Sequence, residues 1–128
     1  MQLTEHFSFE ELTTTSHEEL LESNMAIAEG YMKQLKYVAG TLGEIRAVLG
    51  VPLKVTSGFR SSQLNRLVGG SPTSGHTKGL CADFIPNGVD VVEAQKKIIA
   101  NKYKCPSLKK CILETLYRDW ETDRKSVV

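Results

Sequence analysis

A histidine and an aspartate lie seven positions apart in the segment Ser74–Phe84, which reads SGHTKGLCADF. An imidazole nitrogen and a carboxylate oxygen are both ligands that Zn²⁺ binds in proteins. His76 is in an expected loop, and Asp83 is inside the short apolar strand that follows. These two residues are candidate zinc ligands, with positions left for a third ligand and a water molecule. The alternative is a solvated loop histidine and an aspartate that is hydrogen-bonded to backbone amides in a turn.

Asp83 carries the stronger argument, because a carboxylate is unusual inside an apolar strand. Side chains two positions apart face the same way in a strand, so Asp83 shares a face with Cys81 and Ile85. An unpaired buried carboxylate costs on the order of several kcal/mol unless a cation, a metal or a set of donors meets it. The strand pattern therefore predicts a partner for Asp83.

Arg60 ends a second expected strand, in the segment Val55–Ser61 that reads VTSGFRS. Gly58 allows close backbone approach there, and the loop beyond is rich in Ser and Gly. A guanidinium near a metal-bound water can bind a substrate carboxylate, or the oxyanion formed in peptide hydrolysis, through its fork of donors. The alternative is a plain surface charge at a strand end.

Helices that could position these residues are predicted from periodicity and capping signals. One long helix ending at Gly50 follows from apolar residues at steps of three and four, which are Ile27, Tyr31, Leu35, Val38, Leu42, Ile45 and Leu49. Capping-box spacing predicts helical turns over Phe9–Thr13 and His17–Glu22, and a helix from Asp90 to about Asn101.

Strands are predicted at Leu53–Ser57, Leu80–Ile85 and Cys111–Tyr117. The segment between the first two is mostly loop, with one helical turn over Gln63–Leu67. Helices flanking a few short strands predict an α+β fold with a small, mainly antiparallel sheet.

Composition limits the classes of partner. The chain of 128 residues is long enough for one domain, and 16 basic against 15 acidic residues leave a net charge of +1. Nucleic acid and anionic membranes normally need a basic surplus, so we expect neither as a partner, and we expect a monomer. A module that binds nucleic acid through the lysines at positions 96–110 is the alternative, but such lysines usually form a solvated face.

Three cysteines without CxxC spacing fit reduced thiols in a cytoplasm. The N-terminal residues lack the basic and apolar regions of a signal peptide, and no window approaches the roughly 20 apolar residues of a membrane span. We therefore expect a protein that is cytoplasmic as synthesised.

The segment Ser57–Phe84, SGFRSSQLNRLVGGSPTSGHTKGLCADF, resembles the signature of the M15 family of zinc peptidases. This family includes D-alanyl-D-alanine carboxypeptidases, D-Ala-D-Ala dipeptidases and phage endolysins that cut peptidoglycan peptides. The opening LTEHFSFEEL resembles short phage-type members, so the similarity extends to about Trp120. The resemblance implies a fold like that of D-Ala-D-Ala peptidases and hedgehog domains, and Zn²⁺-dependent hydrolysis of a peptide bond in peptidoglycan stem peptides or cross-links.

The resemblance also implies roles for individual residues. His76 and Asp83 match two zinc ligands, and Arg60 matches the arginine that stabilises the substrate or the transition-state oxygen. Ser74 matches the loop serine before the first ligand, with a role in positioning the substrate. Cys81 is at a position that the family usually gives to a small residue, and we interpret it as core filling.

The C-terminal part departs from the family pattern, which places an acid, a tryptophan, any residue and then a histidine after the last strand. This chain has Asp119 at the position of the catalytic acid and Trp120 at the tryptophan, but Thr122 where the histidine is expected. A neutral hydroxyl is a poor zinc ligand. The alternative function is therefore a catalytically impaired domain that binds cell-wall peptide.

The last six residues, DRKSVV at Asp123–Val128, read like the translation of a sequencing-library adapter. We therefore predict a single peptidase domain over residues 1–122 and a non-native tail over 123–128, with the missing histidine in the uninterrupted gene. Release by a phage lysis system would bring such a protein to the cell wall without a signal peptide.

Overall fold

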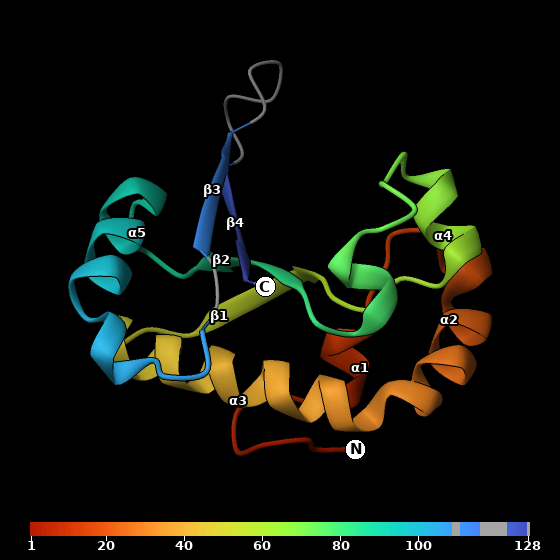
Figure 1. Cartoon of the computed structure of the whole chain (residues 1–128), viewed down its shortest axis with the longest axis horizontal. Coiled ribbons are helices and arrows are strands. Elements are labelled where there is room, and N and C mark those ends of the chain that lie inside the picture. The colour runs from red at the N-terminus through yellow and green to blue at the C-terminus, as the bar shows by residue number, and fades with distance from the viewer. Residues whose placement is uncertain (109–110, 116–122, 128) are drawn as a thin grey trace.

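The computed structural model describes residues 1–108, 111–115 and 123–127. Its strands form one sheet in the order β1-β2-β4-β3, and every neighbouring pair is antiparallel (Figure 1). The strands are β1 (Leu53–Ser57), β2 (Ala82–Pro86), β3 (Cys111–Thr115) and β4 (Asp123–Val127). The prediction of an α+β fold with a small antiparallel sheet is confirmed.

Two of the strand predictions need correction. β2 begins two residues later than predicted, and Leu80 is 40% exposed outside it. No strand is predicted for Asp123–Val127, yet this segment forms β4 between β2 and β3. That residues 123–128 are foreign to the natural protein stays a prediction, which the uninterrupted gene would test.

The helices flank this sheet, with α5 at one end and α2 and α4 at the other (Figure 1). The α-helices are α1 (Phe9–Leu12), α2 (Leu21–Ala28), α3 (Met32–Leu49), α4 (Ser62–Leu67) and α5 (Val91–Ala100). Short 3₁₀ turns cover Glu18–Leu20, Glu29–Tyr31, Gly75–Lys78 and Lys102–Lys104. None of the helices in the described part of the chain is long and apolar enough to cross a membrane.

Capping residues set two of the helix starts as predicted. Ser8 accepts from the Glu11 amide at 3.1 Å while the Glu11 carboxylate accepts from the Ser8 amide at 3.0 Å, a complete capping box. Asp90 accepts from the Glu93 amide at 3.2 Å and begins α5. The capping box predicted before Glu19 is wrong, because the 3₁₀ turn there begins after His17 with no side-chain cap.

The long helix is interrupted, which the periodicity does not predict. Tyr31 leaves the helical region at φ −120° and ψ 23°, after the 3₁₀ turn Glu29–Tyr31. A 3₁₀ turn has three residues per turn, so the 3.6-residue period does not continue across it. Ile27 is consequently 49% exposed on α2 and does not lie on the buried face of α3. The predicted end is correct, because Gly50 has the left-handed φ of 70° that favours glycine.

One hydrophobic core joins α3 to the sheet and to α5. α3 runs along the molecule below β1 (Figure 1) and contributes Leu35, Val38, Leu42, Ile45 and Leu49. The core continues into β1, β2 and α5 through Leu53, Val55, Phe84, Ala94 and Ile98. Burial of this apolar surface fixes β1 and β2, the two strands that flank the candidate site.

Candidate active site

His76 lies in the 3₁₀ turn Gly75–Lys78, between α4 and β2, and not in an open loop. The turn begins at Ser74, whose hydroxyl accepts from the His76 amide at 3.2 Å. The Thr77 hydroxyl donates to the Ser74 carbonyl at 2.7 Å. These local bonds explain why the sequence SGHTKG folds tightly and carries the imidazole inward, where His76 is only 5% exposed.

The two candidate ligands meet inside the protein. His76 Nε2 is 3.6 Å from Asp83 Oδ2, and both side chains are less than a tenth exposed. The other ring nitrogen, Nδ1, is 2.7 Å from the Gly58 carbonyl oxygen. That contact orients the ring so that Nε2 faces the carboxylate. Asp83 therefore has the partner that its position in an apolar strand predicted.

Gly58 can approach His76 because the end of β1 is packed against α1. A Cβ atom at Gly58 would be 2.2 Å from the Leu12 carbonyl oxygen, which no side chain can tolerate. The next residue, Phe59, donates its amide to the same carbonyl at 2.7 Å. The close backbone approach predicted for Gly58 thus allows the chain after β1 to pack against α1. It also places the Gly58 carbonyl where it orients the imidazole of His76.

The charges of the site are coupled. Burial lowers the pKa of His76, but the interactions with Asp83 and Cys81 raise it more, so that the pKa is about 9. The raised pKa favours the protonated imidazole of His76 in the metal-free protein at neutral pH. A metal ion at Nε2 would have to displace this proton.

Arg60 is joined to the same cluster through its backbone and its side chain. Its amide donates to the His76 carbonyl at 3.0 Å, and its Nη2 is 3.4 Å from the Ser74 hydroxyl. The structure therefore brings Arg60, Ser74, His76 and Asp83 together. The predicted catalytic acid Asp119 lies outside the described residues, as do Trp120 and Thr122.

Asn24 is a member of this region that the sequence analysis missed. It is fully buried on α2 and makes three hydrogen bonds, one to Thr13 and two to the residues on either side of Arg60. The sequence contains only a weak indication that Asn24 is buried: it lies four residues before Ala28, the other buried residue of α2. An apolar neighbour at that spacing indicates a buried helix face, but it does not indicate which groups the amide would meet.

The family model described as Peptidase M15 matches residues 6–107. The chain belongs to the Peptidase M15 family. The matched range contains Arg60, Ser74, His76 and Asp83 and ends before Asp119. Peptidases of this family are generally zinc-dependent. Comparison with curated proteins and with solved structures gave no match.

The residues at the site of this M15 peptidase fit part of a zinc centre. In a metal-binding histidine, the ring nitrogen that does not bind the metal usually forms a hydrogen bond with a carbonyl or carboxylate oxygen. Nδ1 of His76 has such a contact with the Gly58 carbonyl oxygen. Nε2 and the Asp83 carboxylate then offer two adjacent ligands. Among the described residues, no group of three or more His, Cys, Asp or Glu side chains could hold a metal ion. A complete zinc centre would need a further ligand from outside the described residues.

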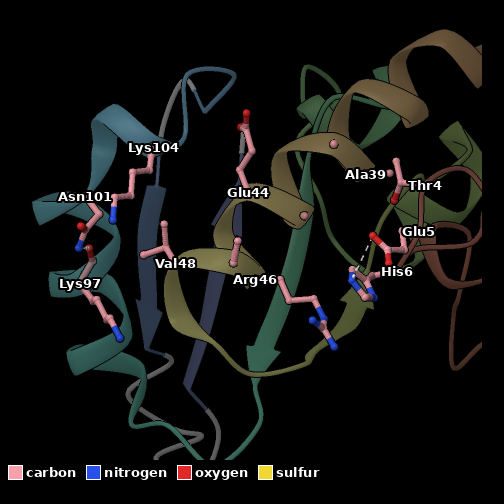
Figure 2. Close-up of a pocket in the computed structure, with 13 residues that line it drawn as sticks. Thr4, Glu5, His6, Ala39, Glu44, Arg46, Val48, Lys97, Asn101 and Lys104 are labelled. Carbon is pink, nitrogen blue, oxygen red and sulfur yellow. Dashed lines mark hydrogen bonds and ion pairs between the residues drawn. The ribbon is translucent and has the colours of Figure 1, made fainter.

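A cleft of about 790 Å³ lies away from these residues (Figure 2). One wall is formed by the N-terminal residues Thr4–His6 and the other by Lys97 of α5 with Asn101 and Lys104 just beyond it, and residues of α3 lie between them. Figure 2 shows Lys97, Asn101 and Lys104 on the α5 side and the Glu5–His6 pair opposite. Of the candidate site residues that the structure describes, Arg60, Ser74, His76 and Asp83, none lines this cleft, so the cleft and the buried pair belong to different parts of the molecule.

Proposed function

We propose that the chain is a zinc-dependent peptidase that hydrolyses a peptide bond in peptidoglycan stem peptides or cross-links, as a D-Ala-type carboxypeptidase or endopeptidase. The observation that carries the proposal is the buried pair of His76 Nε2 and Asp83 Oδ2, 3.6 Å apart. Membership of a peptidase family supports the reaction class. The substrate is inferred from the resemblance of Ser57–Phe84 to cell-wall peptidases.

Each residue has one task in this proposal. His76 Nε2 and the Asp83 carboxylate would hold the ion, which would supply polarisation of the scissile carbonyl and a water with its pKa lowered to about 7. Arg60 binds the substrate carboxylate or the developing oxyanion with its fork of donors. Ser74, 3.4 Å from Arg60 Nη2, positions that guanidinium and the substrate beside it. Asp119 takes a proton from the attacking water and returns it to the leaving amine.

A zinc titration combined with a hydrolysis assay tests the proposal. The chain should bind Zn²⁺ and release peptide fragments from peptidoglycan, and a chelator should stop the release. His76→Ala and Asp83→Asn should abolish both, whereas His17→Ala changes a partly exposed histidine outside the site and serves as the matched control. Release that survives chelation and both substitutions would refute the proposal.

A second candidate is an M15-like domain that binds cell-wall peptide without cutting it. Thr122, in the position where the family pattern has histidine, favours this alternative. Thr122→His separates the two, because it should add a third ligand and raise zinc affinity and hydrolysis together. Binding of peptidoglycan fragments with no hydrolysis in either form would support the binding domain.

The setting of the reaction is part of the same proposal. A monomer made in the cytoplasm and released by a phage lysis system would reach the cell wall without nucleic-acid or membrane partners. Two measurements test synthesis in the cytoplasm followed by release: lysis of cells by protein added from outside, and lysis of cells that express the protein inside.

A further inference from the structure

Asn24 connects segments that are far apart in the sequence. Its Nδ2 donates to the Thr13 carbonyl at 3.1 Å and to the Phe59 carbonyl at 3.0 Å. Its Oδ1 accepts from the Ser61 amide at 2.7 Å. The side chain is fully buried, so water cannot satisfy its polar atoms, and these hydrogen bonds within the protein do so instead.

Two of these bonds bracket Arg60. Phe59 and Ser61 are its neighbours on either side, and Asn24 holds the carbonyl of one and the amide of the other. Arg60 itself donates its amide to the His76 carbonyl at 3.0 Å. The backbone of the arginine is therefore fixed before, at and after the residue, although β1 has already ended at Ser57.

We propose that Asn24 is a positioning residue for Arg60, which keeps the guanidinium beside Ser74 and the turn that carries His76. A long side chain places its donors accurately only when its own backbone is fixed, and misplacement of a binding group by about 1 Å can cost about a hundredfold in rate. Asn24 supplies that fixation from α2, without touching the substrate. The catalytic consequence rests on the proposed peptidase function, but the fixation of Arg60 does not.

A double-mutant cycle in the hydrolysis assay tests the catalytic part. Asn24→Ala should lower kcat/KM by up to about a hundredfold, and Asn24→Asp, which keeps the size but replaces the donating amide, should do the same. In an Arg60→Ala background, neither substitution should lower kcat/KM further, because the group that Asn24 positions is gone. An equal loss in both backgrounds would overturn the proposal. Thr41→Val, at a buried hydrogen-bonding residue far from the site, should lower stability with no dependence on Arg60.

An NMR measurement on the metal-free protein tests the fixation without any activity. In the unaltered chain, the Ser61 amide should exchange with solvent as slowly as core amides, and Asn24→Ala or Asn24→Asp should shift the Arg60 Nε–H signal. Rapid exchange at Ser61, or an unchanged Arg60 signal in the variants, would overturn the proposal. Absence of hydrolysis by the unaltered chain, together with these NMR results, would refute the proposed function and leave the positioning role supported.

Discussion

The candidate site and the cleft lined by Thr4–His6, α3 and the end of α5 satisfy their polar groups in different ways. At the site, His76 and Asp83 are 5% exposed, and the His76 ring and the Asn24 side chain form hydrogen bonds with segments distant in the sequence. In the cleft, the charged residues lie at the surface, and the Glu5–His6 pair is 3.7 Å apart on exposed side chains. Surface pairs are worth little, whereas a buried charge must be matched. The two regions thus differ in how polar groups are satisfied: by hydrogen bonds and an ion pair inside the protein at the candidate site, and largely by solvent in the cleft.

Removal of one member of the buried pair should have the largest effect. His76→Gln removes the imidazole that lies 3.6 Å from the buried Asp83 carboxylate, so the free energy of unfolding should fall by about 3–5 kcal/mol. His6→Gln, in the cleft, should change it by less than about 0.5 kcal/mol. Urea unfolding of both variants without metal measures the difference. Equal losses in the free energy of unfolding would contradict the distinction between the two regions.

The pH dependence of stability should come from the site. The pKa of His76 is about 9 in the folded protein and about 6.5 unfolded, so its protonation favours folding. The contribution, about 2–4 kcal/mol, should be complete below pH 6.5 and lost as the pH rises through 9. Unfolding measured at pH 6, 7.5 and 9 tests this, with His76→Gln as the control whose profile should be flatter. A more stable protein at pH 9 than at pH 6 would contradict it.

Glycine substitutions should have opposite signs in the two regions. Gly58→Ala forces a Cβ against the Leu12 carbonyl and should destabilise the protein by about 1–3 kcal/mol. Gly43→Ala, on α3 beside the cleft, meets nothing within 4 Å and should stabilise the helix by about 0.5–1 kcal/mol. Thermal unfolding compares the two variants. A Gly58→Ala variant as stable as the unaltered chain would show that Gly58 and Leu12 do not pack as closely as they do in the structure.

Charge removal in the cleft should have the smallest effect. Lys97→Ala should change the free energy of unfolding by less than about 0.5 kcal/mol and leave zinc affinity unchanged, because this lysine is on the α5 side of the cleft and not near His76. Isothermal titration with Zn²⁺ and urea unfolding provide the two measurements. A clear loss of zinc affinity would show that the cleft and the site are coupled.

Much of the fold follows from short-range signals in the sequence. The capping box at Ser8, the N-cap at Asp90, the strand Leu53–Ser57 and the helix end at Gly50 each depend on residues a few positions away, and each is confirmed. The prediction fails at Glu29–Tyr31, where the helix is interrupted, although the apolar spacing continues. The ring centroids of Tyr31 and Phe59 are 5.0 Å apart. The two residues are 28 positions apart in the sequence, so no local pattern predicts this contact.

The sequence by itself determined which side chains could hold a metal, because His76 and Asp83 stand out by type and spacing. Only the tertiary structure decided how they meet, with Nδ1 on the Gly58 carbonyl and Nε2 facing the carboxylate. It also decided that Asn24 reaches Ser61 across 37 positions. Caps and periodicity act within a few residues along the chain, whereas a buried hydrogen bond is satisfied by whichever segment packing brings near.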